Sequence, residues 1–131
     1  MKRILIVEDD ANLRVVIRMV LERVGYEVTE ARHGVAALEL IDGGAPDLVI
    51  ADMRMPLMDG VELMDRIRSK PETASLPIVL LSGLQVDDRA WRLATAVVAK
   101  PFEPADLLTS IARALQADTN EPVFDFGGLN T

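Results

Sequence analysis

The chain has 131 residues, half of them hydrophobic, and it contains no cysteine. This length is typical of one domain with a proper core, and the lack of cysteine excludes disulfides and thiolate metal sites. The formal net charge is -7. A chain this acidic lacks the basic surface that binds the phosphate backbone of a nucleic acid, so we expect no direct nucleic-acid binding. Four apolar residues between Arg3 and Glu8 are too few for a signal peptide or membrane span, so we expect a cytoplasmic protein without a membrane partner.

Five short apolar runs have the length of β-strands, and they lie at 3–7, 26–31, 48–51, 78–81 and 96–99. The run at 48–51 is continuously apolar, which predicts a strand buried on both faces at the centre of a sheet. The run Tyr26–Ala31 alternates polar and apolar residues, which predicts a half-exposed edge strand.

Between these runs apolar residues recur at three- and four-residue steps, which predicts amphipathic helices. Gly25 and Gly43-Gly44 end the first two helices, and Pro104 suits the first turn of the last one. A fourth helix, at about 86–93, has the weakest pattern. The residues expected to face the core are Leu13, Val16, Ile17, Val20, Leu21 and Val24 in the first helix, Val35, Leu38 and Ile41 in the second, Leu63, Met64 and Ile67 in the third, and Leu108, Ile111 and Leu115 in the last.

This alternation predicts an α/β fold with a doubly wound, five-stranded parallel sheet and helices on both faces. A polar second strand at the edge and right-handed crossovers favour the flavodoxin-like strand order 2-1-3-4-5. We assign residues 1–117 to this domain and residues 118–131 to a C-terminal tail, because the helical period stops there. The tail is expected to be mobile, although Phe124 and Phe126 argue against a segment that makes no contacts.

Polar residues stand at the ends of four predicted strands, namely Asp9, Asp52, Ser82 and Lys100. Parallel strands bring these ends to one edge of the sheet, where such folds bind their ligands. Asp9 and Asp52 would repel each other if both were ionised, and a divalent cation such as Mg²⁺, which prefers oxygen ligands, removes that repulsion. The acidic net charge therefore has two interpretations: a soluble surface, or carboxylates gathered around a cation.

Other residue types at this edge extend the chemistry. Glu8 can bind a metal through a water molecule. No histidine or cysteine cluster supports zinc, and the single histidine, His33, is predicted to be a surface residue.

A carboxylate beside Mg²⁺ can also attack phosphorus to form an aspartyl phosphate, which makes Asp52 a candidate nucleophile. Lys100 and Ser82 can then contact phosphoryl oxygens, and a cis Lys100–Pro101 bond would direct the ammonium group across the sheet edge.

Residues 2 to about 117 resemble a response-regulator receiver domain of two-component signalling. The resemblance rests on the motifs ILIVEDD, DMRMPLMDG, LLSG and AKPF. It implies that Asp52 accepts a phosphoryl group from a sensor histidine kinase or a histidine phosphotransfer protein. It also implies ligands for Mg²⁺ and contacts for the phosphoryl group: Asp9, Asp52, the Arg54 main-chain carbonyl and Glu8 through water for the metal, and Lys100 and Ser82 for the phosphoryl group.

Two positions depart from the family pattern. Val97 stands where receivers carry Tyr or Phe, and Gly83 follows Ser82 where alanine is more usual. Valine cannot make the inward swing of the aromatic ring, so we expect an altered output from the face formed by the helix at 86–93, the strand at 96–99 and the last helix. Trp91 is either part of a partner surface there or packs over the sheet edge. The Arg54 side chain either pairs with the phosphoryl group or a kinase, or is solvated.

We predict a stand-alone, phosphorylation-controlled binding module with a downstream protein partner, not an enzyme. One alternative is an aspartate-nucleophile phosphatase or phosphotransferase. Those enzymes usually carry a second Asp two residues after the nucleophile, where this chain has Arg54. The other alternative is a degenerate receiver that acts as a phosphate-independent interaction domain, and the complete set of strand-end residues weighs against it.

Overall fold

The computed structural model describes residues 1–83 and 86–117, so the predicted tail at 118–131 lies outside the described residues. The strands are β1 (Arg3–Val7), β2 (Glu27–Ala31), β3 (Leu48–Asp52), β4 (Ile78–Ser82) and β5 (Ala96–Ala99). The helices are α1 (Ala11–Arg23), α2 (Gly34–Gly43), α3 (Gly60–Arg68), α4 (Asp88–Leu93) and α5 (Pro104–Ala117), with a 3₁₀ turn, η1 (Pro71–Thr73), that the sequence did not predict. Among these residues no helix has the length and apolarity needed to cross a membrane.

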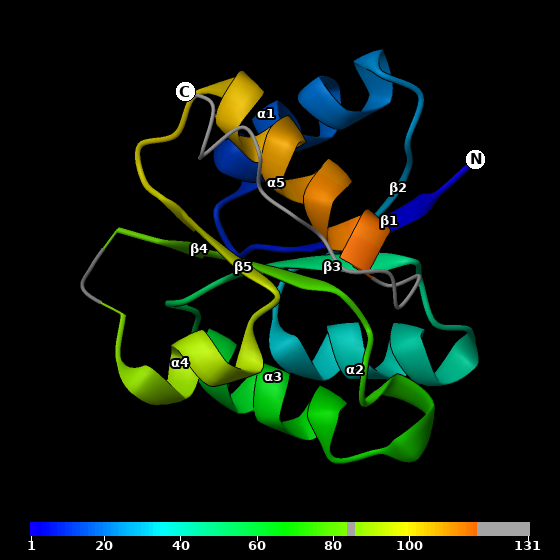
Figure 1. Cartoon of the computed structure of the whole chain (residues 1–131), viewed down its shortest axis with the longest axis vertical. Helices are drawn as coiled ribbons and strands as arrows, with labels where there is room; N and C mark the ends of the chain where they lie inside the picture. Colours follow the sequence, from blue (N-terminus) through cyan, green and yellow to red (C-terminus); the bar gives the residue numbers. More distant parts are fainter. Residues whose placement is uncertain (84–85, 118–131) are drawn as a thin grey trace.

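The strands form one parallel sheet in the order β2-β1-β3-β4-β5, which confirms the predicted flavodoxin-like topology. Helices α1 and α5 lie on one face of the sheet, and α2, α3 and α4 lie on the other (Figure 1). Successive side chains of a strand point to opposite faces. In β1, Ile4 and Ile6 pack with α1 and α5, whereas Leu5 and Val7 pack with the other layer. Two covered faces explain why the central strands are apolar throughout.

The predicted core faces of the helices are right for α3 and partly wrong for α1. In α3, Leu63, Met64 and Ile67 are at most 1% exposed. In α1, Ile17 and Leu21 are the buried residues. Val16 and Val24 are 50% and 55% exposed, although the sequence placed them on the same apolar face. A helix on a sheet buries only a narrow stripe, and an apolar face wider than that stripe leaves side chains in solvent.

Similar differences occur in α2 and α5, where small residues take some of the buried positions. In α2, Ala37 and Ile41 are buried and Val35 is exposed. The buried stripe begins at Gly34, where the helix lies so close to Met58 that a Cβ would be 2.7 Å from its Sδ. In α5 the buried residues are Leu107, Ile111 and Ala114, whereas the predicted Leu108 and Leu115 are half-buried.

The residues that precede α2 and α4 show two further differences from the prediction. His33 is half-buried rather than a plain surface residue, since it precedes α2 and its Nδ1 accepts the Ala36 N–H at 3.1 Å. Helix α4 begins at Asp88, later than expected, because Asp87 caps it by accepting the Ala90 N–H at 2.9 Å.

Gly60 begins α3 where the backbone passes close to β3. Its N–H donates to the Met53 carbonyl at 2.8 Å. A Cβ at Gly60 would lie 2.5 Å from the Asp52 carbonyl oxygen. Because that oxygen belongs to the main chain, no rotamer change relieves the overlap. We therefore expect Gly60→Ala to lower the free energy of unfolding by about 2–3 kcal/mol, measured by urea denaturation.

Gly43→Ala is the matched control for that measurement. Gly43 ends α2, and a Cβ there would meet nothing within 4 Å. We expect this variant to be neutral or stabilised by up to about 1 kcal/mol, because alanine is the better helix former. Equal losses in both variants would contradict the close-approach argument.

Candidate functional site

Asp52 is the last residue of β3, and it is only 5% exposed. Its Oδ2 accepts a hydrogen bond from the Lys100 Nζ at 2.7 Å, and its Oδ1 accepts the Arg54 N–H at 3.3 Å. The carboxylate lines a pocket of about 220 Å³ together with Met53, Arg54, Ser82, Gly83 and Lys100. A buried, charge-paired carboxylate therefore opens onto a space that a small reagent can enter.

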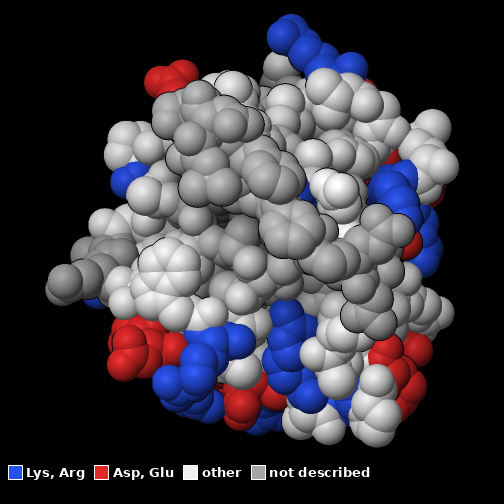
Figure 2. All heavy atoms as spheres, in the orientation of Figure 1, with Lys and Arg blue, Asp and Glu red and all other residues white. Residues whose placement is uncertain are grey.

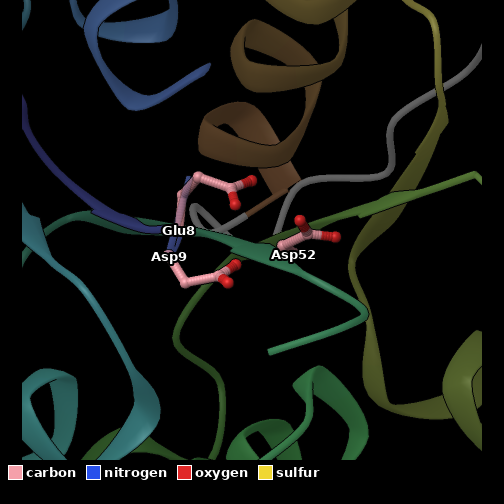
Figure 3. A group of neighbouring side chains, drawn as sticks. All are labelled: Glu8, Asp9 and Asp52. Atoms are coloured by element: carbon pink, nitrogen blue, oxygen red, sulfur yellow. The ribbon is translucent and has the colours of Figure 1, made fainter. Parts of the chain in front are cut away.

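Glu8 and Asp9 follow β1, and Val7 pairs with Ala51 in the register of β1 and β3. Both side chains extend from the end of β1 toward Asp52 (Figure 3). One carboxylate oxygen from each of Glu8, Asp9 and Asp52 lies within 4.8 Å of the others. The three carboxylates thus form the cluster that the sequence predicted at this sheet edge.

Glu8 is 1% exposed, and its Oε1 has no hydrogen-bond partner among the described residues. Burial and the neighbouring Asp52 carboxylate raise the pKa of Glu8 to about 8, although the Asp10 N–H and the Lys100 ammonium oppose this shift. An orphaned carboxylate oxygen beside two further carboxylates requires a proton or a cation. Oxygen-only donors of this kind fit Mg²⁺ and do not fit zinc.

Lys100 and Ser82 complete the edge from β5 and β4. Ser82 ends β4, is 2% exposed, and its carbonyl accepts the Lys100 N–H at 2.8 Å. The Lys100 Nζ lies 3.9 Å from Glu8 Oε1 in addition to its bond to Asp52. The Lys100–Pro101 peptide bond is cis. One ammonium group therefore faces two buried carboxylates.

The backbone of the acidic turn is held by residues that the sequence did not mark. The Arg14 Nη1 donates to the Glu8 carbonyl at 2.8 Å, and the Arg14 Nε pairs with Glu30 Oε1 at 2.7 Å. Arg18 also pairs with Glu30, and Arg18 and Arg14 lower the pKa of Glu30. No local pattern reveals these contacts, because they join α1 to β2 across 12 to 16 positions of sequence.

The structure also places three further residues that the sequence singled out, namely Trp91, Val97 and Arg54. Trp91 lies on α4 and is 57% exposed, so it does not pack over the sheet edge. Val97 is half-buried in β5 opposite Leu80, outside the lining of the Asp52 pocket. Arg54 lines both that pocket and a neighbouring hollow of about 390 Å³ that Asp9 also lines.

Comparison with known proteins agrees with this geometry. Residues 4–112 match the family described as the response regulator receiver domain. The phosphate regulon transcriptional regulatory protein PhoB of Pseudomonas aeruginosa is 33% identical, over 98% of this chain and 59% of its own length. The transcriptional regulatory protein PdtaR of Mycobacterium tuberculosis is 38% identical, over 87% of this chain and 57% of its own length.

Solved structures give the same result. The chemotaxis protein CheY4 of Vibrio cholerae has a TM-score of 0.81 at 30% identity, covering 87% of this chain and 98% of that one. A CheY-like receiver domain protein from Methanospirillum hungatei has a TM-score of 0.84 at 28% identity, covering 93% and 99%. The chain belongs to the response regulator receiver domain family, whose members are signalling modules of two-component systems. It spans about half the length of the curated relatives it matches.

Proposed function

We propose that this cytoplasmic domain accepts a phosphoryl group on Asp52 from a sensor histidine kinase or a histidine phosphotransfer protein. The reaction depends on Mg²⁺, and the phosphorylated form changes its binding to a protein partner. The observation that carries this proposal is the Asp52 carboxylate itself. It is buried, it opens onto a pocket, and it lies 2.7 Å from the Lys100 ammonium and beside two further carboxylates.

Asp9, Asp52 and the Arg54 main-chain carbonyl are the proposed Mg²⁺ ligands, with Glu8 contacting the metal through water. When bound, the ion neutralises the carboxylates and the phosphoryl oxygens. Its binding would satisfy the Glu8 Oε1, which has no hydrogen-bond partner among the residues described and lies 3.9 Å from the Lys100 Nζ.

The side chains of the pocket supply the remaining chemistry. An Asp52 oxygen forms the new O–P bond as the N–P bond of the donor breaks, and the donor imidazole leaves with the bonding pair and takes up a proton. Lys100 exchanges its bond to Asp52 for one to a phosphoryl oxygen, and the Ser82 hydroxyl donates to another. Phosphorylation replaces the single negative charge of the Asp52 carboxylate, which now pairs with Lys100, by nearly two charges on the phosphoryl group, and this change biases the conformational equilibrium.

The proposed partner surface is formed by α4, β5 and α5. Trp91 stands exposed on it, and Val97 replaces the ring that would otherwise link it to the pocket. Acidic and basic side chains gather over the lower part of the face in Figure 2, where α3 and α4 lie in Figure 1. Arg89 on α4 pairs there with Asp65 on α3 at 3.2 Å. A partner that binds this surface meets an aromatic side chain bordered by charges of both signs.

Incubation with Mg²⁺ and acetyl phosphate, followed by intact-mass analysis, tests the phosphoacceptor role. We expect one phosphoryl adduct on the unmodified chain and none on Asp52→Asn or when the metal is chelated. Asp42→Asn is the control, because Asp42 is an exposed aspartate on α2 that pairs with Lys70. It should be modified as fully as the unmodified chain. If no phosphodonor yields an adduct, the proposal is wrong.

Arg14→Met tests how the acidic turn is held for the metal. Arg14 is bonded to the Glu8 carbonyl, so its loss frees the turn that presents Glu8 and Asp9. We expect the affinity for Mg²⁺ to fall by about tenfold, measured by titration calorimetry. Arg18→Met is the matched control, since Arg18 shares the Glu30 carboxylate and makes no bond to Glu8. Equal losses of affinity in both variants would show that Arg14 has no special role.

A further inference from the structure

Arg68, in the last turn of α3, joins three segments that lie apart in the sequence. Its Nε donates to the Leu93 carbonyl at 3.1 Å, its Nη1 to the Leu76 carbonyl, and its Nη2 to the Thr95 hydroxyl oxygen at 3.4 Å. Leu93 is the last residue of α4, whereas Leu76 and Thr95 lie just before β4 and β5. One side chain thus fastens the C-terminal end of α4, which lies beside α3 (Figure 1), to the start of two strands.

The partners of Arg68 are all neutral oxygens. Arg68 takes part in no ion pair with residues 1–83 or 86–117. The side chain is half-buried, and this burial lowers the pKa of Arg68 below its usual range. A half-buried cation without a carboxylate depends on the oxygens that it contacts. The carbonyls at the end of a helix lack partners within the helix and favour a cation, so the bond from Arg68 to Leu93 suits both groups.

The other contacts of α4 in the described part of the chain are weaker. Of its six residues, all of which the structure describes, Ala90 is the buried one. Arg89 pairs with Asp65 of α3 at 3.2 Å, but these side chains are 55% and 56% exposed, so solvent screens the pair. Asp87 accepts the Ala90 N–H, which closes the first turn of α4 without joining it to the sheet. The helix is therefore held most firmly at its Leu93 end.

We propose that Arg68 is the pivot of α4: when Asp52 is phosphorylated, the Asp88 end of the helix moves and the Leu93 end stays in place. This inference rests on the proposed function, because it concerns how phosphorylation reaches the surface formed by α4, β5 and α5. Arg68 is a positioning residue in this account, since it contacts α4 and not the Asp52 pocket.

Helix geometry gives the size of the effect. Asp88 lies about 7.5 Å along the helix axis from Leu93, whereas Arg92 lies only about 1.5 Å from it. A rotation about Leu93 therefore moves Asp88 several times further than Arg92. A translation of the whole helix, which is the alternative, moves both by the same amount.

Distances between pairs of spin labels measure the two ends of α4 in the full chain, which has no cysteine of its own. One variant carries labels at Asp88→Cys and Leu40→Cys, and the other at Arg92→Cys and Leu40→Cys. All three positions are exposed, and Leu40 lies on α2 in the same layer as α4. Each variant is measured by pulsed electron paramagnetic resonance before and after treatment with Mg²⁺ and acetyl phosphate, and intact mass verifies the adduct. We expect the distance change of the Asp88 pair to be at least threefold that of the Arg92 pair.

Arg68→Met removes the three donated bonds and keeps most of the apolar stem. In this background we expect the two distance changes to become equal. Arg66→Met is the matched control, because Arg66 is 56% exposed on the same helix and pairs with Glu62 at 3.0 Å. The control should keep the threefold difference.

Amide hydrogen exchange tests the hold on α4 without phosphate. The Ala94 N–H, which follows Leu93, donates to the Ala90 carbonyl at 3.0 Å. We expect Arg68→Met to speed the exchange of this amide by about tenfold and Arg66→Met to leave it unchanged. An unchanged rate in Arg68→Met would overturn the proposal.

The labelled chains with Arg68 intact decide the matter even if Arg68→Met misfolds. Once the adduct is present, equal distance changes at the two ends, or no change at either, would overturn this inference and leave the phosphoacceptor role standing. A threefold difference that persists in a folded Arg68→Met would show that another contact is the pivot. Failure to form any adduct would refute the proposed function together with the inference.

Discussion

Lys100→Met is expected to lower the free energy of unfolding of the metal-free protein by roughly 3 kcal/mol near neutral pH. The Lys100 ammonium lies 2.7 Å from Asp52 Oδ2 and 3.9 Å from Glu8 Oε1. These carboxylates are 5% and 1% exposed. Removing the ammonium leaves the buried Asp52 carboxylate without its charge partner beside the Glu8 carboxyl group, and neither solvent nor salt screens an unpaired buried charge well. Urea denaturation in the presence of a chelator measures the loss.

Lys70→Met is the matched control for this substitution. Lys70 Nζ lies 2.7 Å from Asp42 Oδ1, the same distance as in the Lys100 pair, but those side chains are 47% and 58% exposed. Because solvent screens an exposed pair, we expect a change below about 1 kcal/mol. Saturating Mg²⁺ should restore part of the stability of Lys100→Met, because a cation again compensates the carboxylates. A Lys100 loss no larger than the Lys70 loss would contradict this account.

Glu8→Gln is expected to remove a pH dependence of stability from the metal-free protein. The pKa of Glu8 is raised in the folded state from an ordinary 4.5 to about 8. Between these values the folded chain keeps a proton that the unfolded chain releases. The contribution of Glu8 to stability is therefore fully present below about pH 4.5 and declines as the pH rises toward 8. Glutamine has nearly the same shape as glutamate and does not titrate, so the stability of the Glu8→Gln variant does not show this decline.

We accordingly expect Glu8→Gln and the unmodified chain to be similarly stable at pH 4.5, and the variant to be more stable by roughly 4 kcal/mol at pH 8 without metal. The difference in stability between the variant and the unmodified chain should become smaller when Mg²⁺ is present. An ion present at a hundred times its dissociation constant stabilises the unmodified chain by about 2.7 kcal/mol, and the variant binds the ion less well. Urea denaturation across this pH range, with and without Mg²⁺, measures both effects.

The control for the pH series is Glu39→Gln, which changes an exposed glutamate on α2. It should leave the pH profile of the unmodified chain unaltered. If the stability of Glu8→Gln and that of the unmodified chain depend on pH in the same way, ionising the buried Glu8 does not destabilise the fold.

Local signals made the strands and the site residues predictable. A strand covered on both faces is apolar at every position, so Ile4 to Val7 and Leu48 to Ala51 stand out from the sequence. The residue that follows such a run lies at the sheet edge, and Asp9, Asp52 and Lys100 meet there for that reason. The chain order of strands and helices leaves few parallel topologies, which made the strand order predictable too.

The helix faces were less predictable, because an apolar periodicity shows which side of a helix is apolar and not how much of it is covered. Val16 and Val24 share their periodicity with Ile17 and Leu21, and only the packing of α1 on the sheet separates the exposed pair from the buried pair. The roles that remain proposals, including those of Ser82, Arg54 and Val97, concern chemistry and output rather than position.

The sequence by itself determined which polar side chains reach the end of the sheet, since strand period and chain order are properties of neighbouring residues. Tertiary structure alone decided how these groups are held. It joined Arg14 to the Glu8 carbonyl, brought Gly60 against the Asp52 carbonyl, and set the Lys100 ammonium between two buried carboxylates. These contacts join residues far apart in the chain, and their strength depends on burial, which no local pattern specifies.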